Sequence, residues 1–361
     1  LSGQLLTEDY YIANKLAKGF IGTSNIDTNS RTCMSSAVVA YKKAFGIDYV
    51  PVRMDDIFDA NLLILVGANT AEAHVVFHNR IKKAKKDGLK IIVIDPRYTD
   101  TAKVADLYLP IRAGSDIDFF NLVAKRILDE GLEDMQFINK YVNNYTLLKN
   151  KFKRVAVTKM LKRTGLSKEQ FEEFWELFKT NQNIISAWTM GLNQSSQGVD
   201  KNLALINLHL LTGKIFKEGN GPLSLTGQPN AMGGREVGGL SSMLAVHLDF
   251  DKESIEKVSE FWNTNNLATK NGYTATEMLE KDIEVLIICH TDPVYHLPNR
   301  NKVEELIKKI PLTKIVYYKK LELTLFFNQI ISHYDTIHIR FYNHGISLFR
   351  CVHYRFTHYI H

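Results

Sequence analysis

The sequence predicts an α/β fold built on parallel β-sheets. Two stretches, Asn61–Val66 and Lys90–Arg97, contain short apolar runs with the length of strands that are buried on both faces. The stretch between them, His74–Lys86, places apolar residues at helical spacing with lysines on the other face. Two strands joined by one helix form a right-handed βαβ unit. A further strand, Asn183–Gly191, and the helix Asn202–Thr212 repeat this arrangement.

The ends of these strands are where a ligand is expected. Parallel sheets bind ligands at the carboxyl ends of their strands, so Gly67–Ala73 and Asp95–Thr101 should lie side by side. Gly67 would let a phosphate approach the backbone, and Asp95 is placed to accept hydrogen bonds from a ribose or a base. The first loop lacks a complete G-x-G-x-x-G pattern, so the motif does not support NAD binding.

A third candidate contact is a turn in the segment Ala105–Asp116, which is expected to form another strand followed by this turn. The turn leads into an N-capped helix predicted over Asp118–Glu130. Farther along the chain, Ser167 is expected to cap the helix Lys168–Lys179 through Gln170.

A lone thiol, Cys33, lies in the short polar segment Thr23–Val38 between two helical stretches. The preceding stretch, Leu1–Phe20, has near-helical apolar spacing, and near its start lies Gln4, whose amide could contact a ligand. A helix is expected to begin at Met34, and its partial positive charge would stabilise a Cys33 thiolate. The alternative from the thiol alone is a buried structural cysteine.

The segment Gly219–Gly239, GNGPLSLTGQPNAMGGREVGG, is so rich in glycine that a long loop without regular structure is expected. Its one strong cation is Arg235, for which the alternative is an ion pair in a surface turn. His209 lies among leucines and is expected to be a core or interface histidine. A last buried strand, Glu284–Cys289, and the helix Asn301–Lys309 follow.

Composition limits the class of protein. The 361 residues are 45% apolar and 23% charged, which is typical of a globular protein, and the net charge of +6 is spread over amphipathic segments. We therefore expect no nucleic-acid partner. No apolar run reaches transmembrane length, so no membrane insertion is expected. The three cysteines are far apart and predict neither a disulfide framework nor a zinc site, which favours a reducing compartment or a role with a cofactor.

Several motifs occur along the chain in a distinctive order and spacing. They are SGQLLTEDYY, NxRxCMSSAV, VGANTAEAH, DPRxTxTA, LPxRAGSD, WTMGLNQ and PLSLTGQPNAMGGREVGG, and they cover Leu1 to about Lys314. In this order and spacing they resemble the molybdenum nitrate reductases of the molybdopterin oxidoreductase family. The resemblance implies the cofactor Mo-bis(molybdopterin guanine dinucleotide), with Cys33 as the molybdenum ligand. The residues that match cofactor-binding positions are Gln4, Asn29, Gly67, Asn69, Glu72, Asp95, Arg97, Ser115, Asp116, Met190 and Gln194.

The reaction that the resemblance implies is the reduction of nitrate to nitrite by oxygen-atom transfer. A thiolate suits molybdenum as a soft ligand, Arg235 would guide the anion, and Met34 and Met232 would limit the pocket. Related formate dehydrogenases carry His after the metal-ligating Cys or selenocysteine. Met34 stands there in this chain and favours nitrate over formate, although a formate dehydrogenase relative remains an alternative. Asn230–Gly234 favours the assimilatory, cytoplasmic type over the periplasmic type, which is also an alternative.

The expected architecture is two Rossmann-like domains of the DMSO reductase fold with the cofactor across the cleft between them. One domain combines Leu1–Thr32 with about 221–314, and the other is inserted as Cys33–Asn220. The chain is expected to be a fragment, because the family has an N-terminal domain with a [4Fe–4S] cluster and a β-rich C-terminal domain. Residues 315–361 are expected to be an out-of-frame or divergent tail.

Two consequences of this incompleteness stay open at this point. The sequence does not distinguish ferredoxin, flavodoxin, an NADH-linked subunit or a cytochrome as the electron donor. A non-catalytic remnant that no longer binds cofactor is the alternative to an enzyme.

Overall fold

The chain divides into two compact units, which are described separately. The computed structural model describes residues 1–316, 340–342 and 345–347. Unit 1 contains residues 1–32 and 228–361, and unit 2 contains residues 33–227. The first division falls at the expected residue, between Thr32 and Cys33. The second lies after Gly227, later than the expected 220, because 221–224 form a strand of the unit 2 sheet.

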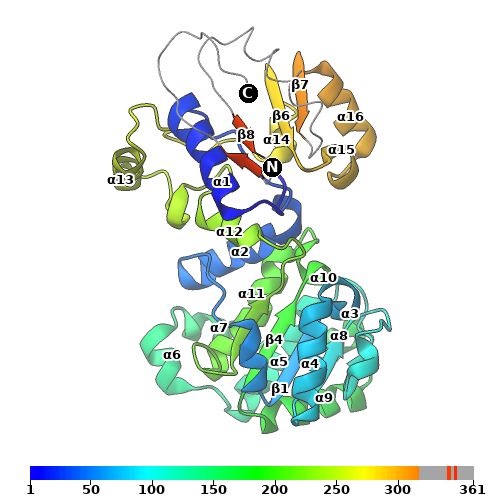
Figure 1. Cartoon of the computed structure of the whole chain (residues 1–361). Coiled ribbons are helices and arrows are strands. Elements are labelled where there is room, and N and C mark those ends of the chain that lie inside the picture. Colours follow the sequence, from blue (N-terminus) through cyan, green and yellow to red (C-terminus); the bar gives the residue numbers. More distant parts are fainter. Residues whose placement is uncertain (317–339, 343–344, 348–361) are drawn as a thin grey trace, which may run out of the picture. The chain divides into compact units, whose positions relative to one another are not determined.

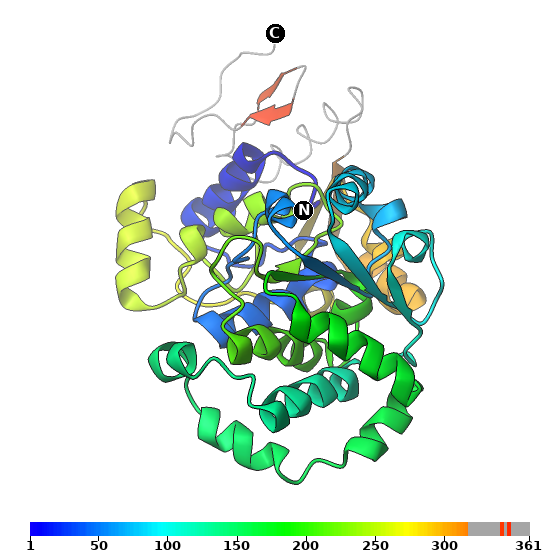
Figure 2. The ribbon, with the colours of Figure 1, turned by 90° about the horizontal axis from the view of Figure 1, so that it is seen from below.

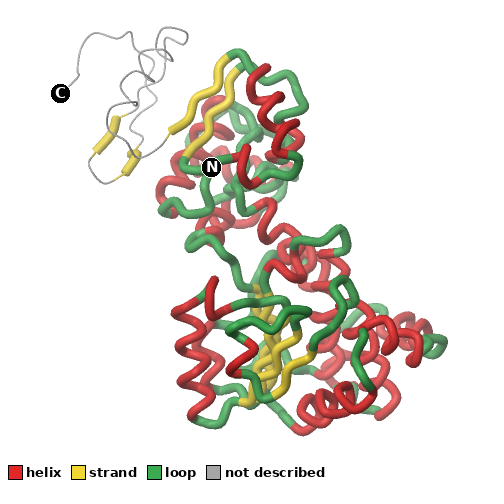
Figure 3. Tube along the Cα trace, turned by 90° about the vertical axis from the view of Figure 1, so that its right-hand side faces the viewer, coloured by secondary structure: helices red, strands yellow, loops and turns green. Residues whose placement is uncertain are grey.

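Unit 2 is a five-stranded parallel sheet with helices on both faces (Figures 1 and 3). The strand order is β3-β2-β1-β4-β5. The strands are β1 (Leu62–Val66), β2 (Lys90–Ile94), β3 (Leu107–Leu109), β4 (Ile184–Trp188) and β5 (Gly221–Ser224). The helices are α2 (Arg31–Phe45), which begins in unit 1, η2 (Met54–Phe58), α3 (Thr70–Ala73), α4 (Val75–Lys86), η3 (Ala102–Val104), α5 (Asp116–Glu130), α6 (Met135–Tyr141), α7 (Tyr145–Phe152), α8 (Val157–Thr164), α9 (Lys168–Thr180), α10 (Met190–Asn193) and α11 (Gly198–Thr212).

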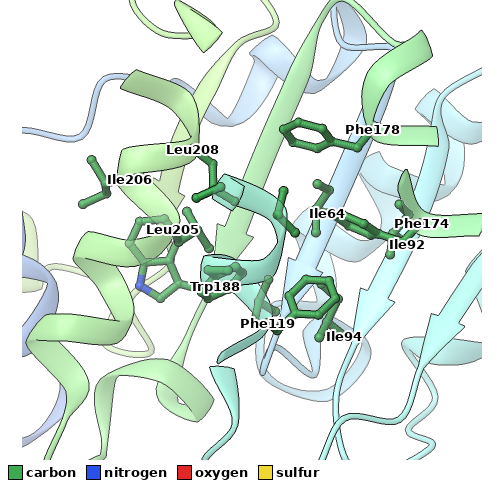
Figure 4. Packing of buried hydrophobic residues seen from close by; sticks show 14 of the residues in the cluster. Ile64, Ile92, Ile94, Phe119, Phe174, Phe178, Trp188, Leu205, Ile206 and Leu208 are labelled. Atoms are coloured by element: carbon green, nitrogen blue, oxygen red, sulfur yellow. The ribbon is translucent and has the colours of Figure 1, made fainter. Parts of the chain in front are cut away.

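Alternation of side chains along β1 produces a core on each face of this sheet. The ribbon in Figure 2 shows helices on both sides of the sheet. Ile64 packs with residues of α5, α9 and α11, whereas Leu63 and Leu65 pack with residues of α4. Figure 4 shows the first of these cores, in which Phe119 and Trp188 lie among aliphatic side chains. All five residues of β1 are buried, as predicted for a strand covered on both faces.

The expected βαβ unit is confirmed, since β1 and β2 pair in parallel with Val66 opposite Ile94. The capping box of α9 is also confirmed: Gln170 N donates to Ser167 Oγ at 3.2 Å, and Ser167 N donates to Gln170 Oε1 at 3.0 Å. His209 is buried and hydrogen-bonded through both ring nitrogens, as expected of a core histidine.

Unit 1 is built around short helices and a two-stranded parallel sheet, β6 (Val285–Cys289) with β7 (Leu312–Val316). Its helices are α1 (Thr7–Asn14), the π-helix η1 (Lys15–Ile21), α12 (Ala231–Glu236), η4 (Ala245–His247), α13 (Lys252–Trp262), α14 (Ala275–Met278), α15 (Pro293–His296) and α16 (Arg300–Lys309). A separate antiparallel pair joins β8 (Arg340–Tyr342) and β9 (Gly345–Ser347). Apart from these two strands and from 315–316, which belong to β7, the expected tail lies outside the described residues.

Two expectations about local structure are wrong. The segment Gly219–Gly239 is not a continuous loop, because it contains β5 and α12, which gain hydrogen bonds and packing that propensity does not reveal. The helix after the polar segment begins at Arg31, so Cys33 lies within its first turn. The first stretch is helical from Thr7 to Ile21, as its spacing predicts, and changes from α-helical to π-helical geometry at Lys15.

Candidate active site

The order of the strands in unit 2 reverses between β1 and β4, and the loops that follow these two strands contact each other there. Thr189 Oγ1 and Gly191 N donate to the carbonyl oxygen of Gly67 at 2.8 Å and 3.2 Å. A Cβ atom on Gly67 would lie 2.7 Å from the Cα of Gly191, so only glycine fits this approach. Ligands of open parallel sheets bind at such a reversal.

The loops after β1 and β2 lie side by side, as the sequence predicts. Thr101 Oγ1 donates to Asn69 Oδ1 at 2.8 Å and accepts from Ala71 N at 3.0 Å. Within the described part of the chain, Asn69 Nδ2 and Thr99 Oγ1 are buried and have no hydrogen-bond partner. Buried polar atoms normally have partners, so these two atoms suit a polar ligand at this edge of the sheet.

Two acidic side chains stand at the same edge. Burial raises the pKa of Asp95, and the Arg97 backbone N–H, which donates to Asp95 Oδ1 at 2.9 Å, opposes that effect. The Asp116 carboxylate begins α5 and pairs with Lys201 Nζ at 2.7 Å, in a site where both side chains are at most 10% exposed. Asp116 also contributes to the raised pKa of Asp95 through like-charge repulsion.

The other predicted cofactor-binding residues of unit 2 differ in their exposure. Ser115 is buried, and its hydroxyl donates to the Arg112 carbonyl at 2.7 Å. Glu72, Arg97 and Gln194 are exposed on the loops that follow β1, β2 and β4.

The Cys33 thiol lies against the segment that follows β4. Cys33 is 7% exposed, and its Sγ is 3.4 Å from Met190 Sδ. The neighbouring Met34 is buried, and its Sδ accepts from Asn193 Nδ2 at 3.3 Å. Ser36 Oγ donates to the Asn193 carbonyl at 2.8 Å, so α2 and α10 are joined by several contacts. Cys33, Met34 and Met190 are therefore brought together.

In unit 1, the first predicted cofactor-binding residues are held close to one another. Gly3 N donates to Asn29 Oδ1 at 2.7 Å, and Asn230 N donates to the Gly3 carbonyl at 3.2 Å. The adjacent Gln4 is exposed, which leaves its amide accessible.

Arg235 lies on α12 and is only 3% exposed, so the alternative of a surface turn is wrong. Its guanidinium donates to the Met232 sulfur one turn earlier on the same helix. A buried guanidinium of this kind suits recognition of an anion.

Three residues that contribute to these arrangements were not singled out from the sequence: Thr101, Asn193 and Lys201. The sequence could have indicated Lys201, because a lysine in a largely apolar helix must be buried with a partner or reach the surface. Thr101 and Asn193 act through hydrogen bonds to distant residues, and such pairings leave no local pattern in the sequence.

Two features are absent from the described residues: a cluster of metal-binding side chains and a membrane-spanning helix. No group of three or more His, Cys, Asp or Glu side chains gathers there in a way that could hold a metal ion by itself. None of the helices in this part of the chain is long and apolar enough to cross a membrane.

Comparison with known proteins identifies the family to which this fold belongs. The profile of the molybdopterin oxidoreductase family matches residues 1–319. The chain belongs to this family. Its fold is also similar to that of acetylene hydratase from Pelobacter acetylenicus, with a TM-score of 0.53 and 24% identity over 59% of this chain and 29% of the other.

Among molybdopterin oxidoreductases, the chain is 42% identical to a nitrate reductase of Klebsiella oxytoca, over 87% of this chain and 36% of that protein. It is 33% identical to the α subunit of an F420-dependent formate dehydrogenase of Methanocaldococcus jannaschii, over 86% of this chain and 46% of that subunit. The chain thus spans less than half the length of these relatives.

Proposed function

We propose that this chain is the catalytic part of a molybdenum-dependent nitrate reductase that holds Mo-bis(molybdopterin guanine dinucleotide), with Cys33 as the protein ligand to molybdenum. The observation that carries the proposal is the Cys33 thiol at the start of α2, whose Sγ lies 3.4 Å from the Sδ of Met190, the first residue of α10. Thiolate is a soft ligand that suits molybdenum among dithiolene sulfurs. The nitrate reductase of Klebsiella oxytoca supports nitrate as the substrate.

The residues of unit 2 fit the dinucleotide parts of this cofactor. Gly67 and Gly191 hold the loops after β1 and β4 together at the reversal of strand order, and a phosphate would bind beside these loops. Asn69 and Thr99 supply buried polar atoms. Asp95 and Asp116 supply carboxylate oxygens, which accept hydrogen bonds from a ribose or from a guanine base.

The cofactor, when bound, supplies a two-electron oxygen-atom transfer. Nitrate takes up two electrons and two protons and yields nitrite and water. The protein binds and orients the anion. Arg235 offers a planar guanidinium to a planar trigonal oxyanion, in a buried position where the electrostatic attraction is strong.

Methionine side chains would limit the space around the reacting groups. Met34 follows Cys33 and is held by Asn193, whereas Met232 contacts the Arg235 guanidinium. Both present an apolar thioether, which excludes water without competing for the anion.

We propose a cytoplasmic, assimilatory role on the basis of the segment Asn230–Gly234.

The experiment that tests this function replaces Cys33 by Ala in the cofactor-loaded enzyme. Nitrite formation with reduced viologen should fall to background, because molybdenum loses its protein ligand. The matched control is Cys289→Ala, since Cys289 is the other buried free cysteine among the described residues and lies on β6 of unit 1. Full activity in the Cys33→Ala enzyme would remove Cys33 from the metal site.

A second candidate function is formate oxidation, which the similarity to the formate dehydrogenase of Methanocaldococcus jannaschii favours. Formate-dependent dye reduction by the loaded enzyme, in the absence of nitrite formation, would replace the nitrate proposal. Purified protein should contain molybdenum and guanine nucleotide in about a 1:2 ratio, since each metal is held by two dinucleotides. Protein that contains neither would be a non-catalytic remnant.

A further inference from the structure

A lysine is fully buried inside unit 1 and donates to three backbone carbonyls. Lys18 is 0% exposed, and its Nζ lies 2.5 Å from the Gly238 oxygen, 2.9 Å from that of Leu240 and 2.7 Å from that of Met243. An ammonium group has three N–H donors, so each has a carbonyl acceptor. All three acceptors belong to one short segment, 238–243, which we call the post-helix turn because it follows α12.

The backbone around Lys18 has an uncommon conformation. Lys18 lies in the middle of η1, a seven-residue π-helix that continues α1. π-helices are rare and occur frequently at functional sites, and such geometry persists only where tertiary contacts determine it. Those contacts are made at Lys18 and Gly19, the two buried residues of η1. Besides the Nζ bonds, the Lys18 carbonyl accepts from Ala268 N at 2.8 Å.

The post-helix turn is hydrogen-bonded directly to the helix that carries Arg235. Gly238 N donates to the Arg235 carbonyl at 3.0 Å, and Gly239 N donates to the Gly234 carbonyl at 2.6 Å. Gly238 has φ +82°, and a Cβ there would lie 2.7 Å from Ala245 N, which fixes the path of the chain. A displacement of this turn would therefore move the last residues of α12.

The helix α12 depends on its surroundings for its position. It has six residues, too few for a helix that is stable by itself. Tyr10 packs against Gly234 at its centre, where an added Cβ would lie 3.1 Å from the ring. Asn230 Nδ2 donates to the Leu5 carbonyl at 2.8 Å at its start. The C-terminal end, where Arg235 lies, is held through the post-helix turn and Lys18.

We propose that Lys18 is a positioning residue that sets the place of Arg235 by binding the three carbonyls of the post-helix turn. The inference rests on the proposed function in one respect, namely that Arg235 binds nitrate. Lys18 itself is enclosed by the backbone and acts on the anion only through Arg235. It is therefore expected to influence the affinity for nitrate more than the rate of the chemical step.

The first test is hydrogen exchange on the chain as it stands, which needs neither cofactor nor activity. Lys18→Met removes the donors, and exchange at Gly238 and Gly239 should accelerate about tenfold or more, because the post-helix turn loses its three hydrogen bonds to the lysine. The exchange is measured at pH 6, below the pKa of about 7 of the buried Lys18, so that the ammonium form is present. Protection of α13, in the same unit, should stay unchanged. Lys18→Arg keeps the charge and the donors and should restore part of the protection.

Lys15→Met is the matched control, because Lys15 lies one turn earlier in η1 and its Nζ is above the Tyr11 ring, 6.0 Å from the centroid. It should leave exchange at the post-helix turn unchanged. If Lys18→Met leaves exchange in 231–243 unaltered, or accelerates exchange equally throughout unit 1, the proposal is overturned. The second result would mean a general loss of stability.

The second test is kinetic and uses the loaded enzyme. Lys18→Met should raise the KM for nitrate about tenfold, with kcat and molybdenum content within about twofold of the unsubstituted enzyme. A loss of molybdenum in step with activity would overturn the positioning role. If the unsubstituted enzyme forms no nitrite, the proposed function fails, whereas the exchange experiment still decides the role of Lys18.

Discussion

Gly67 and Gly191 contact each other through their backbones, at the point where β1 and β4 end. A Cβ on Gly191 would lie 2.5 Å from the Cα of Gly67, closer than carbon atoms approach without repulsion. The loops that carry Asn69 and Met190 thus have their mutual position fixed by the absence of two side chains.

Gly191→Ala should lower the free energy of unfolding of the chain by about 1–3 kcal/mol, since the methyl group must displace backbone. Gly67→Ala should cost more, because Gly67 also has φ +52°, where residues with a Cβ are strained by about 1–2 kcal/mol. Urea titration monitored by circular dichroism measures both values.

The control for backbone strain alone is Gly46→Ala, at φ +80° with open space around it. It should cost only about 1–2 kcal/mol. A Gly191→Ala chain as stable as the unsubstituted chain would show that the two loops can separate without cost.

The buried ion pair of Lys201 with Asp116 predicts a large effect from a single change. Lys201→Met leaves the Asp116 carboxylate buried without its partner, which should cost about 3–5 kcal/mol of unfolding free energy. Lys125→Met is the control, because its partner Asp129 is half exposed and such surface pairs contribute about 0–1 kcal/mol. If a denaturation experiment gave the same loss of unfolding free energy for both substitutions, burial would not determine how much the Lys201–Asp116 pair contributes.

Arg235→Lys should raise the KM for nitrate about tenfold or more, since an ammonium group loses the planar, bidentate geometry of the guanidinium. Arg53→Lys provides a control at an exposed arginine on unit 2 and should leave both the KM for nitrate and kcat unchanged. Steady-state nitrite assays give both constants. An unaltered KM in Arg235→Lys would exclude Arg235 from the anion site.

The buried Lys18 also predicts how stability depends on pH. Burial lowers the pKa of Lys18 to about 7 in the folded chain, from 10.5, while Asp27 opposes and Arg31 adds to that shift. Between these values the unfolded chain holds a proton that the folded chain has released, so the unfolding free energy rises with pH from about 7 to about 10.5. Lys18→Met should lose this part of the rise.

Chemical denaturation of both chains at pH 6.5 and at pH 9 measures the difference. Lys214, whose pKa burial lowers to about 8, contributes a similar rise to both chains and cancels in the comparison. If the unfolding free energy of both chains depended on pH in the same way, Lys18 would have the same pKa in the folded and unfolded states.

Parts of the site that depend on strand ends were predictable from the sequence. The apolar runs of β1 and β2 predict the two strands, and the geometry of a βαβ unit then places Gly67–Ala73 beside Asp95–Thr101. The hydrogen bond from Thr101 Oγ1 to Asn69 Oδ1, at 2.8 Å, follows from that placement but was not itself predicted. Each step of that inference uses a local pattern and one general rule of sheet geometry.

Other parts were not predictable, because they depend on contacts between residues distant in sequence. Glycines in 231–239 argue against a helix, yet α12 forms there with Tyr10 and the post-helix turn as its support. Helical spacing would not identify Lys18 as a core residue, since the change to π-helical geometry at Lys15 alters which side chains face inward.

The division of unit 1 into two segments has a consequence for the order of events on the ribosome. Residues 1–32 leave the exit tunnel first, but their partners begin at Gln228, after the whole of unit 2. Unit 2 is continuous, so its sheet can assemble during translation once β5 has emerged. Tyr10 and Lys18 therefore lack their native contacts during that interval. Unit 1 is completed after unit 2, and residues 1–32 stay unfolded or exposed until residues 228–243 have been synthesised.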